Sequence, residues 1–168
     1  MPVSCLPKII LPQLTDLSPE LLRSHGITSL LMDFDNTIVP YTTDVPTERM
    51  AAWLQEMQRS GIFLCVVSNS RKQRVVRFCE TYELACVTHS RKPFQKGIRK
   101  ALHRYDLHPE QTALVGDQIF TDVLGANCGG LTSILITPIH LNNIWLKLRN
   151  WAEQPFIRAA KKRNGSFS

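Results

Sequence analysis

The chain has 168 residues, enough for one domain with a substantial core but too few for two domains of ordinary size. Hydrophobic residues make up 43% of the sequence and charged residues 20%, a composition that is typical of a globular protein and excludes a low-complexity or fibrous chain. The net charge of +6 and the pI of about 9.3 favour anionic partners, whether phosphate esters, acidic lipid surfaces or nucleic acid.

The cysteines and the hydrophobic runs bear on the cellular compartment. The five cysteines form no C-x-x-C pair, and three lie in apolar strand or helix contexts, so we expect reduced thiols and a reducing compartment. The first twelve residues lack the continuous apolar core of a secretory signal, and no apolar run is long enough to span a bilayer. These features favour a cytoplasmic protein, with peripheral contact with a membrane surface left open.

Helical and extended segments alternate along the whole chain. The first helix begins at Pro19, with Ser18 as its N-cap, and ends at Gly26. Strands are predicted at 29–32, 62–67, 85–88, 112–115 and 133–137, with helices around 50–57, at 71–82, after Pro93, and before Gly129 and Gly130. This alternation predicts an α/β fold of three layers, doubly wound around a mainly parallel sheet of five strands.

Two carboxylates follow the first predicted strand. The buried run 29–32 stops at Asp33 and Asp35, whose side chains point the same way from an extended backbone. Two such charges 4 Å apart repel by about 4 kcal/mol at an effective dielectric of about 20, and a bound Mg²⁺ is the usual compensation. From these residues alone, a strand end with an ordinary Asx-turn is the alternative. An EF-hand loop fits poorly, because its Gly and Glu positions hold Ile38 and Asp44.

Small polar clusters also follow the other strands. Ser68 and Asn69 come after the second strand, Lys92 after the third and Asp117 after the fourth. Because the carboxyl ends of parallel strands meet at one edge of the sheet, we expect these side chains to converge with the two carboxylates there. Convergence of several clusters favours a functional site over a simple turn.

Together these residues could perform phosphoryl transfer. Asp33 could attack phosphorus, while Asp35 gives a proton to the leaving oxygen and later activates water. Ser68, Asn69 and Lys92 could hold the phosphate oxygens. Asp33, Asp117 and the backbone carbonyl of Asp35 would offer oxygen ligands to Mg²⁺, and Asp122 would ligate it or act through a water.

The same residues resemble the four motifs of haloacid-dehalogenase (HAD) superfamily phosphatases. Residues 33–37 are similar to the D-x-D-x-T motif, Ser68 to the second, Lys92 to the third, and 116–122 to the fourth. The details resemble subclass IIIA, in its YqeG-like family related to phosphatidylglycerophosphate phosphatases. The resemblance covers about residues 11–138. It implies a Rossmann-like fold, an Asp33 nucleophile, an Asp35 acid/base, phosphate binding by Ser68 and Lys92, and metal binding by Asp117.

A cap domain, which many HAD enzymes insert near the first motif, has no room in this sequence. Only a loop and one helix lie between Thr37 and Ile62, and one helix with a short strand between Ser70 and Lys92. An open site suits a substrate that brings its own cover, such as a lipid headgroup, a macromolecule or a partner subunit.

The last segment, 139–168, is predicted to be separate from the 1–138 domain. Leu141, Ile144, Trp145, Leu148 and Trp151 recur at helical spacing with basic residues between them, and Pro155 is expected to interrupt the pattern. This helix could pack on the core, contact a membrane surface, or bind a nucleic acid or protein partner.

The leading hypothesis is a Mg²⁺-dependent phosphomonoesterase that forms an aspartyl-phosphate, with phosphatidylglycerophosphate as the favoured substrate. The alternatives are a phosphatase of another phosphorylated macromolecule or metabolite, and a non-catalytic module that binds an anion, RNA or protein. We expect nucleic acid to be the less favoured partner, and the sequence does not indicate an oligomeric state.

Overall fold

A computed structural model describes residues 4–69, 73–90, 95–139 and 144–164, and the α6 side chains from 152 to 162. The described strands form one parallel sheet of six strands in the order β1-β6-β5-β2-β3-β4. The strands are β1 (Ile9–Leu11), β2 (Ser29–Met32), β3 (Phe63–Val67), β4 (Ala85–Val87), β5 (Thr112–Gly116) and β6 (Thr132–Ile136). The helices are α1 (Pro19–Ser24), α2 (Glu48–Arg59), α3 (Gln73–Thr81), α4 (Lys96–Arg104), α5 (Leu124–Cys128) and α6 (Ile144–Asn164).

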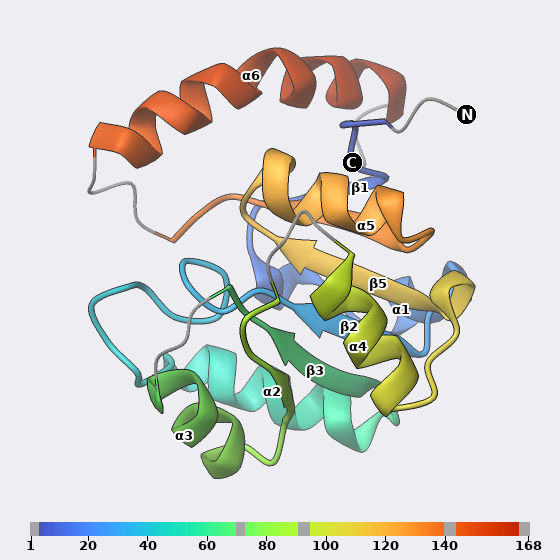
Figure 1. Cartoon of the computed structure of the whole chain (residues 1–168), viewed down its shortest axis with the longest axis vertical. Coiled ribbons are helices and arrows are strands. Elements are labelled where there is room, and N and C mark those ends of the chain that lie inside the picture. The colour runs from blue at the N-terminus through green and yellow to red at the C-terminus, as the bar shows by residue number, and fades with distance from the viewer. Residues whose placement is uncertain (1–3, 70–72, 91–94, 140–143, 165–168) are drawn as a thin grey trace.

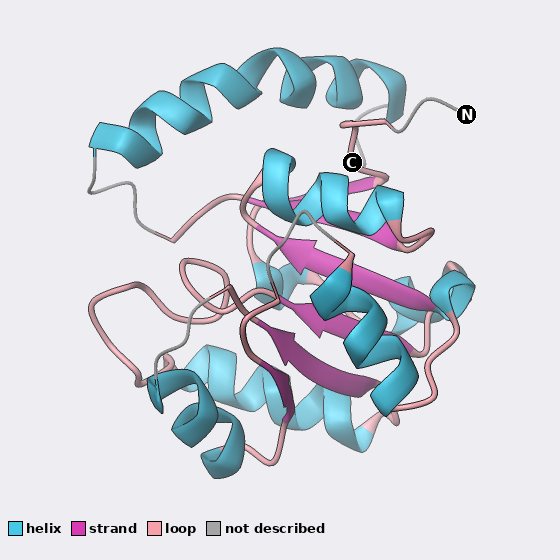
Figure 2. Ribbon diagram, in the orientation of Figure 1, coloured by secondary structure: helices cyan, strands magenta, loops and turns pink. Residues whose placement is uncertain are grey.

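Helices cover both faces of the sheet, as the alternation in the sequence predicts (Figure 2). On β2, Leu30 and Met32 join the core formed with α1, α2 and α3, whereas Leu31 joins the core formed with α4 and α5. Figure 1 shows α4 and α5 on one side of the strands and α1 and α2 on the other. A strand that is buried on both faces consists of consecutive apolar residues, which is why β2 was recognisable in the sequence.

The predicted three-layer α/β fold is confirmed, but the sheet has six described strands where five were expected. The additional strand is β1, whose Ile9 lies opposite Ile134 of β6 at the edge of the sheet. It has three residues and lies between Pro7 and Pro12, so it is too short to show an alternating pattern. Proline is tolerated at the ends of an edge strand because no neighbouring strand needs its missing N–H.

The connections around β2 and β3 leave the carboxyl edge of the sheet without a cap. A loop and α2 join β2 to β3, and the described part of the connection from β3 to β4 holds α3 alone. In Figure 1 the arrowheads of β5, β2 and β3 point to the same edge. The site expected at this edge is therefore bordered by loops of the domain itself.

The C-terminal helix α6 continues through Pro155, so the expected interruption at this residue is wrong. Phe156 and Ile157 pack against a small core beside β6, and the Phe156 and Phe120 rings have centroids 5.6 Å apart. This packing supplies an anchor for the second half of the helix, and helps to offset the backbone hydrogen bond that a proline removes. None of the helices in the described residues is long and apolar enough to cross a membrane.

Candidate active site

The backbone places Asp33 and Asp117 side by side at the ends of adjacent strands. Met32 of β2 lies opposite Val115 of β5, and the N–H of Asp33 continues the ladder by donating to the Val115 carbonyl at 2.9 Å. Asp117 follows Val115 by two residues and lies just beyond the end of β5, where its carboxylate is close to that of Asp33. The pairing register of two strands therefore brings together two carboxylates that are far apart in sequence.

A third carboxylate, Asp122, completes this group. Oxygen atoms of Asp33, Asp117 and Asp122 all lie within 4.8 Å of one another. The three residues are 7%, 5% and 1% exposed, so water screens their charges poorly. The sequence left open whether Asp122 would bind a metal directly or through a water, and the structure places its carboxylate within the group itself.

Asp122 is held by the turn that follows Asp117. It lies in η3 (Ile119–Val123), a π-helical turn before α5, and its Oδ2 accepts a hydrogen bond of 3.2 Å from the Gln118 N–H. Gly116 lies directly beside this carboxylate, and a Cβ at that position would overlap the carboxyl carbon and oxygen of Asp122. The glycine is required here because of this close approach.

The chemistry of the carboxylate group fits a divalent cation. Carboxylate oxygens are the ligands that Mg²⁺ prefers, and three buried negative charges this close together need a compensating positive charge. Among the described residues, these three aspartates make the one such group of potential metal ligands. Asp33, Asp117 and Asp122 are therefore the side chains that could hold the ion.

Asp35 lies at the same edge but has a different neighbour. Its Oδ1 is 3.3 Å from Nη1 of Arg74, and both side chains are mostly buried. A tight turn separates it from the helix that follows: Asn36 has φ of +61°, a left-handed conformation that asparagine tolerates, and the Asn36 N–H donates to Val39 at 2.7 Å. The two carboxylates of the first motif therefore have separate partners.

Hydrogen bonds connect the loops that follow β3 and β4 at the carboxyl edge of the sheet. Ser68 is buried, and its carbonyl accepts a 3.0 Å hydrogen bond from the Ser90 N–H, while the Ser90 hydroxyl donates to Oδ1 of Asn69 at 2.6 Å. Ser90, which is fully buried, was not predicted from the sequence to be a site residue. Lys92 lies outside the described residues. His89, three residues earlier in the sequence, is exposed.

A second residue that the sequence analysis missed is Glu153 of α6. It is 2% exposed, and its Oε1 accepts hydrogen bonds from the N–H groups of Ile119 and Phe120 at 3.0 and 3.4 Å. These are the first N–H groups of η3, the turn that carries Asp122. The C-terminal helix thus supports the loop that positions two of the three grouped carboxylates.

A mostly apolar cavity of about 600 Å³ adjoins the edge of the sheet. Thr37 and Ile38 form its wall next to the first motif, and Val45 and Ile139 line it from the loops after β2 and β6. The cavity offers space for an apolar group next to the segment that follows β2.

All five cysteines are free thiols, as expected. Burial raises the pKa of Cys65 in β3 to about 12, so this thiol stays protonated at neutral pH. Among the described residues, no cysteine belongs to the group of potential metal ligands. The oxygen chemistry of the aspartates therefore defines the site.

Comparisons with known proteins bear on the family and the fold. Residues 89–138 match the HAD-hydrolase-like family. The chain is 31% identical to "Probable phosphatase YqeG" of Bacillus subtilis over 160 residues, which cover 95% of this chain and 93% of that one. An HAD phosphatase from Thermococcus onnurineus matches with a TM-score of 0.55 at 15% identity, covering 70% of this chain and 90% of that one. The cobalt-bound deoxy-D-mannose-octulosonate 8-phosphate phosphatase of Haemophilus influenzae matches with a TM-score of 0.53 at 11% identity, covering 82% and 91%.

Substitution of Gly116 by alanine tests the close approach to Asp122. The added methyl group would displace the carboxylate or the strand, so we expect Gly116→Ala to lose about 1–3 kcal/mol of stability and to weaken divalent-cation binding. Urea unfolding measures the stability, and calorimetric titration with Mg²⁺ measures the affinity. Unchanged values for both would contradict the arrangement.

Substitution of Glu153 tests the support from α6. Glu153→Ala leaves two buried N–H groups without their acceptor, and we expect a loss of about 1–3 kcal/mol in the free energy of unfolding. Glu153→Gln keeps an acceptor oxygen and should lose less. Equal stability of the alanine variant and the wild type in urea unfolding would show that the helix does not support this turn.

Proposed function

The chain belongs to the HAD superfamily of phosphatases, in its YqeG-like family, and from this premise we propose that it is a Mg²⁺-dependent phosphomonoester hydrolase acting through an aspartyl-phosphate. The observation that carries the proposal is the corner where Asp33, Asp117 and Asp122 meet, with Asp35 two residues beyond Asp33. It combines a nucleophile, an acid and a cation-binding group at one edge of an open sheet.

In the proposed first step, a carboxylate oxygen of Asp33 attacks phosphorus and the bond from phosphorus to the leaving oxygen breaks. Asp35 gives its proton to that oxygen, which leaves as an alcohol. In the second step, Asp35 takes a proton from water, whose oxygen attacks the phosphorus of the aspartyl-phosphate. Inorganic phosphate leaves and the Asp33 carboxylate is regenerated, so the net reaction consumes one ester and one water.

The remaining residues hold the phosphate. Ser68 and Asn69 follow β3, and with Lys92 they would bind its non-reacting oxygens. A Mg²⁺ ion bound by Asp33, Asp117, the carbonyl of Asp35 and Asp122, directly or through water, would offset the negative charge of phosphate and carboxylates. The order of the strands in the sheet supports this assignment, because β3, β2 and β5 are neighbours.

For the substrate, we favour phosphatidylglycerophosphate, a lipid whose headgroup carries a phosphomonoester. The apolar cavity beside the first motif supports an ester with an uncharged part. Four large hydrophobic residues of the described chain are exposed. Three of them, Tyr41, Val45 and Ile139, lie in the loops that follow β2 and β6 at the carboxyl edge of the sheet. With no insertion covering this edge, a membrane surface could approach it directly.

The basic C-terminal segment supports the same substrate class. Arg158, Lys161 and Lys162 of α6 are exposed, while Phe156 and Ile157 anchor the helix to the domain. Exposed basic residues on an anchored helix are attracted to anionic lipid at about 1 kcal/mol each. The segment 139–168 would then be a membrane-contact element on the 1–138 phosphatase domain.

The function is tested with purified protein, a panel of phosphomonoesters that includes phosphatidylglycerophosphate, and Mg²⁺. We expect phosphate release that EDTA abolishes, and a loss of at least about a thousandfold in Asp33→Asn because the amide cannot act as the nucleophile. The circular dichroism spectrum of the variant should match that of the wild type.

One result would contradict the function, and another would contradict the substrate preference alone. Absence of phosphate release from every ester would refute it, and salt-sensitive binding of RNA or protein that survives Asp33→Asn would then favour the non-catalytic alternative. Equal turnover of lipid and soluble esters would refute the substrate preference while leaving the phosphatase intact.

Charge reversal in α6 tests the membrane contact. We expect Lys161→Glu with Lys162→Glu to lower binding to vesicles of anionic phospholipid by about tenfold or more, since two attractive charges become repulsive. Hydrolysis of a soluble ester should stay unchanged. The matched control is Arg99→Glu with Lys100→Glu, which reverses two exposed charges on α4. If both double variants bind vesicles equally well, α6 is not the contact.

A further inference from the structure

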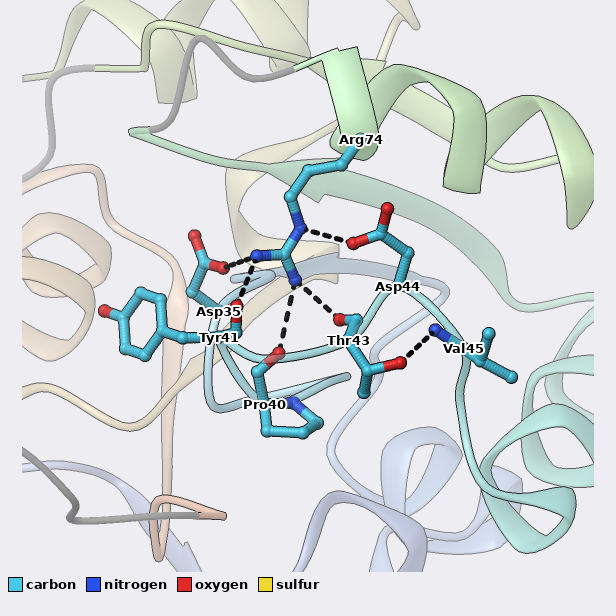
Figure 3. A network of polar contacts seen from close by, with 7 residues as sticks. All are labelled: Asp35, Pro40, Tyr41, Thr43, Asp44, Val45 and Arg74. Atoms are coloured by element: carbon cyan, nitrogen blue, oxygen red, sulfur yellow. Dashed lines mark hydrogen bonds and ion pairs between the residues drawn. The ribbon is translucent and has the colours of Figure 1, made fainter.

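Arg74 lies in the first described turn of α3, and its side chain crosses to the segment that follows β2 (Figure 3). Its side chain is 12% exposed, and its guanidinium contacts several oxygen atoms of that segment. Nη1 donates to the Tyr41 carbonyl at 3.0 Å, and Nη2 donates to the carbonyls of Pro40 and Thr43 at 3.2 and 2.7 Å. Three backbone carbonyls of one loop thus converge on a single cation.

The same guanidinium contacts two carboxylates. Nε is 2.8 Å from Oδ1 of Asp44, which is largely exposed, and Nη1 is 3.3 Å from Oδ1 of the mostly buried Asp35. In Figure 3 the second oxygen of Asp35 points away from Arg74. One oxygen of the Asp35 carboxylate therefore forms an ion pair with the arginine, and the other is directed away from it.

An aromatic contact fixes the guanidinium in turn. Its central carbon lies 5.1 Å from the centroid of the buried Phe34 ring, and Phe34 separates Asp33 from Asp35 in the sequence. A planar guanidinium that stacks on a ring and donates to several acceptors has few alternative orientations. The arginine is therefore a rigid support for the residues around it.

The geometry points to Arg74 as the positioning residue of the reaction: it orients the Asp35 carboxylate for proton transfer and fixes the 40–44 loop at the rim of the site. A general acid must lie within hydrogen-bond reach of the leaving oxygen, and an unsupported aspartate would sample several rotamers. This inference rests on the proposed phosphatase function, since the orientation of Asp35 has a consequence only if a proton is transferred.

Leaving groups of different acidity separate this role from a general loss of structure. An alkyl alcohol, as in phosphatidylglycerophosphate, needs a proton when it leaves, whereas p-nitrophenolate departs without one. We expect Arg74→Ala to lower kcat/KM, which reports the steps up to departure of the alcohol, by about tenfold or more on phosphatidylglycerophosphate and by less than about threefold on p-nitrophenyl phosphate. Arg74→Lys keeps the charge but not the fork of donors, and should give the same pattern to a smaller extent.

Two controls complete the experiment. Arg77→Ala removes an exposed arginine from the same helix and should leave both rates unchanged. In an Asp35→Asn background, Arg74→Ala should lower kcat/KM for phosphatidylglycerophosphate by less than about twofold, because the asparagine amide cannot donate a proton to the leaving oxygen.

The outcomes distinguish this inference from the function on which it rests. A wild-type protein that hydrolyses neither ester refutes the phosphatase function, and the role of Arg74 with it. An active wild type in which Arg74→Ala and Arg74→Lys lower kcat/KM equally for both esters, or in which the loss persists undiminished in the Asp35→Asn background, refutes the positioning role alone.

Discussion

Repulsion among three buried carboxylates is the constraint on which this structure depends. With oxygen atoms within 4.8 Å, each ionised pair among Asp33, Asp117 and Asp122 repels by about 3–4 kcal/mol at an effective dielectric of about 20. A fold can hold such a group only if its backbone is fixed independently of those side chains. The parallel pairing of β2 with β5, together with the hydrogen bond from Asp33 to Val115, provides this frame.

The frame also explains why loops distant in sequence meet at one point. Met32 of β2 lies opposite both Val66 of β3 and Val115 of β5, so the three strands end at nearly the same level. The residues just beyond those ends therefore emerge together. On the β5 side, the fold adds a turn whose first N–H groups bond to Glu153 of α6, so this helix helps to fix the loop that carries Asp117 and Asp122.

The sequence was sufficient to predict the central strands and the polar residues at their ends, because both depend on local patterns: buried apolar runs followed by carboxylates or hydroxyls. It could not show β1, which has too few residues for a pattern. Nor could it show Ser90, Arg74 or Glu153, because their partners are distant in the chain. Glu153 looked like one acidic residue in a basic tail, and its acceptor role depends on N–H groups 33 and 34 positions away. Arg74 likewise looked like one cation among several in a basic helix.

Asp33 and Asp35 are identical side chains two residues apart, and their surroundings are what give them different parts in the proposed reaction. Asp33 lies among carboxylates, where a cation would neutralise the group and leave an oxygen available to attack phosphorus. Asp35 instead faces a guanidinium that is fixed by a loop and an aromatic ring. In HAD enzymes with a cap, an inserted domain covers this edge. In the part of this chain that the structure describes, no inserted domain covers the edge. The orientation of the proposed acid would then come from the domain itself, through Arg74, which reaches across from α3.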